Sequence, residues 1–192
     1  MEIGKTLHAK NREEWRKWLE KNHEKEKEIW LVFPRKSSGK ERIPYKDCVE
    51  EALCYGWIDG ILKNIDEEKY CQRFSPRRSN SQLSELNKEH VRRMIKLGKM
   101  TPAGLKAIAH AYDIKKDEKE AKKLVIPEDI LQTIKSNKEA WKNFQKFSIG
   151  YKRVRISYIE SYRNYDKSLF DSKLAYFVKM TSKNKTYGFL RD

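Results

Sequence analysis

Guanidinium groups, hydroxyls and amides are concentrated between residues 73 and 87. Arginine forks and hydroxyls together suit phosphate or carboxylate groups, because they offer directed donors and positive charge. A helix predicted to begin near Asn87 would add the positive end of its dipole. The alternative is a surface loop whose polar side chains satisfy their own backbone. The candidate anion contacts are Arg73, Ser75, Arg77, Arg78, Ser84 and Asn87.

A carboxylate precedes this stretch in an apolar setting. Asp59 follows Trp57 and Ile58 in a predicted strand, where aspartate is disfavoured. A buried carboxylate needs a partner, and Arg73 on the adjoining predicted strand is the expected one. We therefore count Trp57 and Asp59 among the candidate ligand-binding residues. Asp59 could also act as a general base with Glu50 or Glu51, but a structural ion pair is the simpler interpretation.

Other residue types that carry chemistry are not arranged as recognisable sites. The four histidines are scattered, and the glycines form neither a phosphate-binding loop nor a dinucleotide fingerprint. We therefore expect no catalytic residue, no metal and no cofactor. Cys48, Cys54 and Cys71 match no zinc spacing and are interpreted as reduced thiols of a cytoplasmic protein. No apolar run approaches a membrane span, and the N-terminal residues lack the apolar core of a secretory signal.

The net charge of +15 is concentrated in the second part of the chain. Residues 1–86 carry 18 basic and 16 acidic side chains, whereas residues 87–192 carry 25 and 12. This imbalance suggests either a polyanion partner such as nucleic acid or a lysine-rich solvated surface. Basic residues close to tyrosines would suit phosphate contacts and base stacking. The residues of this kind on one predicted helix are Tyr151, Lys152, Arg153, Arg155, Tyr158 and Tyr162.

The elements that would position these residues indicate an α+β fold. A small N-terminal antiparallel sheet with packed helices is predicted, followed by a helical C-terminal region. The sheet is expected from strands at 29–33, from 57 onward and at 70–74, with helices over 12–22 and 45–55. Later helices are expected to begin at N-caps or at prolines. These residues are Asn87, Thr101, Pro127, Asn137, Ser148 and Asp166.

Charge and composition also predict the domain organisation. Residues 114–126 are highly charged and contain no aromatic residue, which is typical of a linker. We therefore expect an α+β domain over 1–113 and a helical region over 127–192. Five Trp, ten Tyr and seven Phe provide enough apolar surface for cores in both.

Several short motifs resemble the YdeI/OmpD-associated, or bacteriocin-protection, family. They are Ala52-Leu53-Cys54, Gly56-Trp57-Ile58-Asp59, Arg73-Phe74, Pro76-Arg77 and Asn87. The resemblance extends back to REEWRKWLEKNHEKEKEIWLVF and forward to IPEDILQTIKSNKEAWKNFQKFS. Two positions depart from the family, because Leu83 and Tyr158 each stand where its members usually carry tryptophan.

The resemblance implies a small soluble protein linked to tolerance of bacteriocins or other antimicrobial peptides, with no established catalysis. The leading hypothesis is a non-enzymatic protein that binds a ligand or partner through an anion-binding pocket. A small anionic molecule or an acidic partner would suit that pocket. Nucleic-acid binding by the basic C-terminal helices is the alternative, and an enzyme using Asp59 with Glu50 or Glu51 is a second one. The sequence leaves the oligomeric state open.

Overall fold

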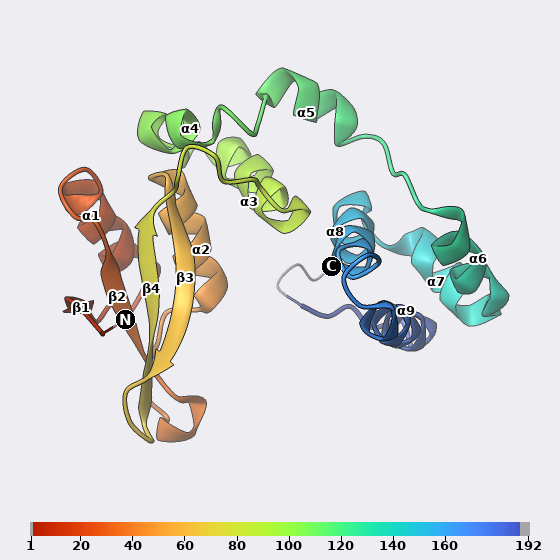
Figure 1. Cartoon of the computed structure of the whole chain (residues 1–192), viewed down its shortest axis with the longest axis horizontal. Helices are drawn as coiled ribbons and strands as arrows, with labels where there is room; N and C mark the ends of the chain where they lie inside the picture. Colours follow the sequence, from red (N-terminus) through yellow and green to blue (C-terminus); the bar gives the residue numbers. More distant parts are fainter. Residues whose placement is uncertain (1, 189–192) are drawn as a thin grey trace. The chain divides into compact units, whose positions relative to one another are not determined.

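The computed structural model describes residues 2–188, which fall into two compact units (Figure 1). Unit 1 consists of Met1–Leu83 and His90–Tyr112, and unit 2 consists of Ser84–Glu89 and Asp113–Asp192. The chain thus enters unit 2 briefly, returns to unit 1, and crosses again after Tyr112. The α+β class predicted from the sequence is confirmed, since the sheet lies in unit 1 and unit 2 is helical.

The sheet of unit 1 has the strand order β1-β2-β4-β3. Its long strands β2 (Ile29–Pro34), β3 (Trp57–Asn64) and β4 (Lys69–Pro76) pair antiparallel, as predicted. The two-residue strand β1 (Thr6–Leu7) was not predicted, and it pairs parallel with β2, so the sheet is mixed. So short a strand has too few residues to show an alternating pattern.

Helices α1 (Arg12–Asn22) and α2 (Tyr45–Cys54) pack on one face of this sheet. Their buried side chains share one core with Ile29, Trp57 and Phe74. Between β2 and α2 lies the short 3-10 helix η1 (Lys36–Ser38).

Helix α4 (Pro102–Ile108) lies against the end of α2, and a glycine makes this approach possible. A Cβ added at Gly104 would lie 2.1 Å from the carbonyl oxygen of Cys54. The neighbouring Gly56 adopts a φ of 76°, in the left-handed region that favours glycine, and turns the chain from α2 into β3.

Unit 2 is built on five further helices, α5 (Ile114–Glu120), α6 (Glu128–Ser136), α7 (Lys138–Lys146), α8 (Ile149–Glu160) and α9 (Lys167–Ser182). The predicted caps Asn137 and Ser148 each accept a backbone N–H at the start of a helix, and so does Asp166, where the last helix was predicted to begin. The core of the unit comes from α6 to α9, including Ile134 and Phe177. The predicted linker over 114–126 begins with α5.

Helix α3 (Glu85–Lys96) begins before the predicted position. Asn87 was expected to cap it, but the hydroxyl of Ser84 accepts the backbone N–H of Asn87 at 3.2 Å. Asn87 therefore lies within the first turn. Both residue types are good caps, and the earlier one is used here.

Candidate functional site

The predicted pairing of Asp59 with Arg73 is wrong. Asp59 accepts a hydrogen bond from the hydroxyl of Tyr45, whereas Arg73 Nε donates to Glu28 at 2.8 Å. The register explains this, because Asp59 stands opposite Phe74 on β4 and Arg73 is the next residue along that strand. Successive side chains of a strand point to opposite faces, so Asp59 and Arg73 do not meet. Burial, and then the Asp59 carboxylate, raise the pKa of Tyr45.

Arg77 forms hydrogen bonds to residues of the loop that follows it. It is 8% exposed, and its Nη1 donates to Ser81 Oγ and to the carbonyl oxygen of Gln82, both at 3.2 Å. Burial lowers the pKa of Arg77, an effect that the charge of Asp59 opposes. Among the described residues no carboxylate forms an ion pair with Arg77, and its Nε has no hydrogen-bond partner.

The eight predicted ligand-binding residues have different surroundings. Trp57 is a core residue, 1% exposed, whose Nε1 donates to the carbonyl oxygen of His23 at 3.1 Å. Ser75 stands opposite Ile58 in the sheet, and Arg78 is exposed. Six of the eight lie in unit 1, whereas Ser84 and Asn87 belong to unit 2.

Leu83, which stands where the resembled family usually has tryptophan, is also a core residue. It is 8% exposed and packs in a cluster with Leu53, Val91 and Ile108. Its side chain therefore contributes to folding of unit 1.

Two adjacent glutamates of α2 are completely buried, and the first of them, Glu50, has four cationic or imidazole neighbours, of which Lys46 Nζ is the most distant at 3.9 Å. Arg93 Nη1 donates to Glu50 at 2.6 Å and Arg12 Nη1 at 2.9 Å, while His90 Nδ1 lies 3.1 Å away. Burial disfavours the charged form, but these neighbours outweigh it and lower the pKa of Glu50 to about 2.

The second glutamate, Glu51, is held in the same way. Arg12 Nε donates to it at 2.5 Å and Arg16 Nη1 at 2.6 Å. Both carboxylates are thus committed to arginines, and Asp59 is bonded to a tyrosine. The enzyme hypothesis, which required Glu50 or Glu51 near Asp59, stays a prediction.

The basic residues of α8 do not form an exposed phosphate-binding face. Lys152 and Arg155 are 8% and 7% exposed, and Lys152 Nζ donates to the carbonyl oxygen of Gln145 at 3.0 Å. Arg153 forms an ion pair with Glu89 at 2.7 Å. These three cations are therefore not exposed for the phosphate contacts that the nucleic-acid hypothesis requires.

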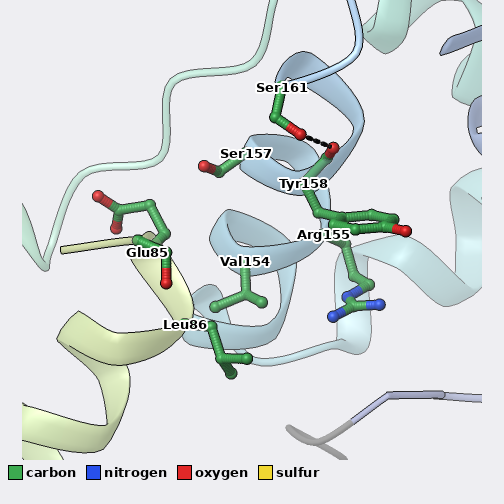
Figure 2. A pocket seen from close by; sticks show the side chains of 8 residues that line it. Glu85, Leu86, Val154, Arg155, Ser157, Tyr158 and Ser161 are labelled. Atoms are coloured by element: carbon green, nitrogen blue, oxygen red, sulfur yellow. Dashed lines mark hydrogen bonds between the residues drawn. The ribbon is translucent and has the colours of Figure 1, made fainter. Parts of the chain in front are cut away.

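A pocket of about 210 Å³ lies in unit 2, between the start of α3 and one face of α8 (Figure 2). Seven of its lining side chains are labelled in the figure, and Ser84 completes the set. The lining residues are Ser84, Glu85, Leu86, Val154, Arg155, Ser157, Tyr158 and Ser161. Of the residues predicted for the anion pocket, only Ser84 is among them, while Arg155 and Tyr158 come from the set considered for nucleic-acid binding.

Arg155 is the cation of this pocket. Its guanidinium carbon lies 5.0 Å from the ring centroid of Tyr187 and 5.5 Å from that of Tyr158, within the range of cation–π contacts. Among the described residues Arg155 forms no ion pair, and its buried Nε has no hydrogen-bond partner. A sequence signal was available, because Tyr151 and Tyr158 are four residues before and three after Arg155, on the same side of a helix.

Two other polar side chains of the pocket have local partners. Ser161 Oγ donates to the carbonyl oxygen of Tyr158 at 2.8 Å, the dashed line in Figure 2. Glu85 Oε1 accepts from Lys88 Nζ at 2.7 Å, which offsets its negative charge. Within residues 2–188 no group of three or more His, Cys, Asp or Glu side chains could hold a metal ion. No helix in that range is long and apolar enough to span a membrane.

Two family profiles match the chain in its two parts. Residues 7–107 match a family described as a domain of unknown function (DUF8412), and residues 123–184 match the family described as Bacteriocin-protection, YdeI or OmpD-Associated. The motifs from Ala52 to Asn87 that suggested the second family thus lie in the region matched by the first. Neither the curated proteins nor the solved structures contain a significant match. The chain therefore belongs to the DUF8412 family through residues 7–107, and its residues 123–184 are similar to the family described as Bacteriocin-protection, YdeI or OmpD-Associated.

Proposed function

We propose that the protein is a non-enzymatic binding protein that holds a small anionic molecule in the pocket of unit 2. The observation that carries the proposal is Arg155, a guanidinium group 7% exposed that lines a pocket and has no acidic partner among the described residues. An unpaired buried charge is costly, and an anionic ligand would supply the missing partner.

Three further features of the pocket favour an anion. Ser84 and Ser157 supply hydroxyl groups. The pocket adjoins the first turn of α3, where the backbone N–H groups of Glu85 and Leu86 have no partner among the described residues. A helix of 12 residues also directs the positive end of its dipole toward this position.

The match to the Bacteriocin-protection, YdeI or OmpD-Associated family covers part of the pocket. Helix α8, which forms one wall of the pocket, lies within the matched residues 123–184. Tyr158, which takes the place of a tryptophan usual in the resembled family, lines the pocket. We propose that uptake of the anion contributes to tolerance of bacteriocins or antimicrobial peptides, as the family description suggests. The buried free thiols Cys48, Cys54 and Cys71 support the proposal of a cytoplasmic location.

Thermal denaturation in the presence of a panel of carboxylates and phosphates tests the proposal. A ligand at 100 times its Kd adds about 2.7 kcal/mol to the free energy of unfolding. For a chain of this size that raises Tm by roughly 5–10 °C. The shift should be lost in Arg155→Gln and kept in Arg163→Gln, a control arginine of unit 2 that does not line the pocket.

A second variant covers the case in which Arg155→Gln fails to fold. Ser157→Leu fills the pocket without removing a charge, so it should also abolish the ligand-induced shift. The proposal is wrong if no anion of the panel shifts Tm. It is equally wrong if a shift persists in both pocket variants.

A further inference from the structure

Four tyrosines of unit 2 form a continuous band with two cations. The ring centroids of Tyr176 and Tyr187 lie 5.0 Å apart. Those of Tyr158 and Tyr162 lie 5.4 Å apart. Arg155 joins the two pairs, because its guanidinium carbon lies close to the rings of both Tyr187 and Tyr158, the latter visible beside it in Figure 2. We call the following residues the tyrosine band: Tyr158, Tyr162, Tyr176, Tyr187, Arg155 and Lys173.

Two rings of the band are open to solvent. Tyr158 and Tyr176 are 39% and 47% exposed. The cations hold the rings by cation–π contacts, since Arg155 lies between two of them and Lys173 Nζ is 5.9 Å from the ring centroid of Tyr162. A ring that its neighbours already hold loses little rotamer freedom when a flat group stacks on it. The band therefore presents preorganised stacking surfaces.

Exposed lysines continue the band along α9. Residues 172–188 contain four lysines and no acidic residue. Lys179 and Lys183 follow Tyr176 by three and seven residues, so the three side chains share one side of the helix, and all three are exposed. Within residues 2–188 none of the four lysines forms an ion pair. Their charges are therefore available to an anionic partner.

Aromatic rings beside cations suit single-stranded nucleic acid, because unpaired bases stack on the rings while phosphates meet the cations. We propose that the tyrosine band and the lysines of α9 bind single-stranded RNA or DNA without sequence preference. Bases stack on Tyr158 and Tyr176, and phosphates meet Lys179 and Lys183. This activity goes beyond the anion pocket, which Tyr176 and the two lysines do not line.

An anionic membrane surface also attracts lysines, but this helix is poorly suited to one. A helix that lies on a membrane buries an apolar face in it. The apolar face of α9, formed by Phe170, Leu174 and Phe177, is already part of the core of unit 2. The outer side, where lysines accompany Tyr176, therefore favours the nucleic acid.

Fluorescence anisotropy of the full chain with labelled oligonucleotides tests the inference. The probes are oligouridylate and oligothymidylate of about 12 nucleotides, within the range of site sizes of proteins that bind single strands. We expect both to bind more tightly than a duplex of the same length, whose bases are not free to stack. If all four lysines meet phosphates, the logarithm of the association constant should fall with the logarithm of the salt concentration with a slope of about −3. The tighter of the two probes identifies the natural strand as RNA or DNA.

Two sets of variants separate stacking from charge. Tyr176→Leu should weaken binding at least about fivefold, whereas Tyr176→Phe, which keeps the ring, should bind as wild type does. The double variant Lys179→Gln, Lys183→Gln should reduce the steepness of the salt dependence by about 1.4. Lys115→Gln with Lys119→Gln is the matched control, because both are exposed lysines of α5 in the same unit, and it should leave the slope unchanged.

Three results would overturn the inference. One is the absence of binding to either single strand at low salt. Another is binding of the duplex, or of the single strands by Tyr176→Leu, as tightly as wild type binds the single strands. The third is binding of vesicles of anionic phospholipid by a protein that ignores both strands, which would assign this surface to a membrane. Each of these outcomes leaves the anion pocket to be judged by its own ligand panel.

Discussion

Replacing Glu50 by Gln should strongly destabilise unit 1. The side chain is completely buried and neutralises Arg12 and Arg93, whose side chains are 20% and 44% exposed. Breaking a fully buried ion pair costs about 3–5 kcal/mol. Because both arginines keep some contact with water, we expect the lower end of that range, about 3 kcal/mol. The corresponding fall in Tm is roughly 6–12 °C.

The same variant predicts a dependence on pH. The pKa of Glu50 is about 2 in the folded protein, below its ordinary value of 4.5. A lowered pKa means that the charged carboxylate stabilises the folded state above pH 4.5, and that this contribution disappears as the pH falls from about 4.5 to about 2. The stability difference between wild type and Glu50→Gln should therefore shrink over this interval.

Urea denaturation followed by tryptophan fluorescence measures both effects, since four of the five tryptophans lie in unit 1. Glu68→Gln is the control, because the Glu68–Lys40 pair of the same unit is 63% and 59% exposed. Such exposed pairs contribute about 0.2–1 kcal/mol. If Glu50→Gln costs no more than the control at neutral pH, the buried network does not stabilise the fold as argued.

Three further substitutions test the packing and electrostatics of unit 1. Gly104→Ala places a Cβ 2.1 Å from the Cys54 carbonyl oxygen and should cost about 3 kcal/mol in urea denaturation, whereas an unchanged midpoint would contradict the close approach. Leu83→Ala should cost at least about 2 kcal/mol in the same assay, and a cost below about 0.5 kcal/mol would mean that Leu83 is not a core residue. Asp59→Asn should lower the raised pKa of Tyr45, so tyrosine-labelled NMR in alkaline solution should show Tyr45 starting to ionise at a lower pH than in wild type; an unchanged onset would exclude the contact.

Local signals in the sequence predicted most of the elements. Asn11, Asn137 and Ser148 each cap the helix that follows them, because a short polar side chain beside an amphipathic pattern is a strong start signal. At the start of α3 two such residues compete, and the choice of Ser84 over Asn87 depends on packing that no local pattern records.

Side-chain partners were harder to predict than elements. The register between β3 and β4 shifts between Asp59 and Leu62, so the neighbour of Asp59 could not be counted from the turn. Glu50 and Glu51 were considered only as possible acid partners of Asp59, whereas both are buried and hydrogen-bonded to arginines from α1 and α3.

The sequence could not predict the pocket, because the pocket depends on contacts between distant parts of the chain. Its walls come from residues 84–86 and from α8, which are about 70 residues apart in the chain. Arg155 was assigned to a solvent face with its basic neighbours, but the tyrosines around it bury its side chain. Only the folded arrangement shows that this arginine borders a cavity and has no acidic partner within residues 2–188.

Amide NMR of the full chain during titration with hexanoate tests the anion site most directly. We predict chemical-shift changes at Ser84–Leu86 and along α8 from Val154 to Ser161, with both sets absent in Arg155→Gln. Shift changes centred on the Arg77 loop of unit 1, or changes in unit 2 that persist in Arg155→Gln, would contradict it.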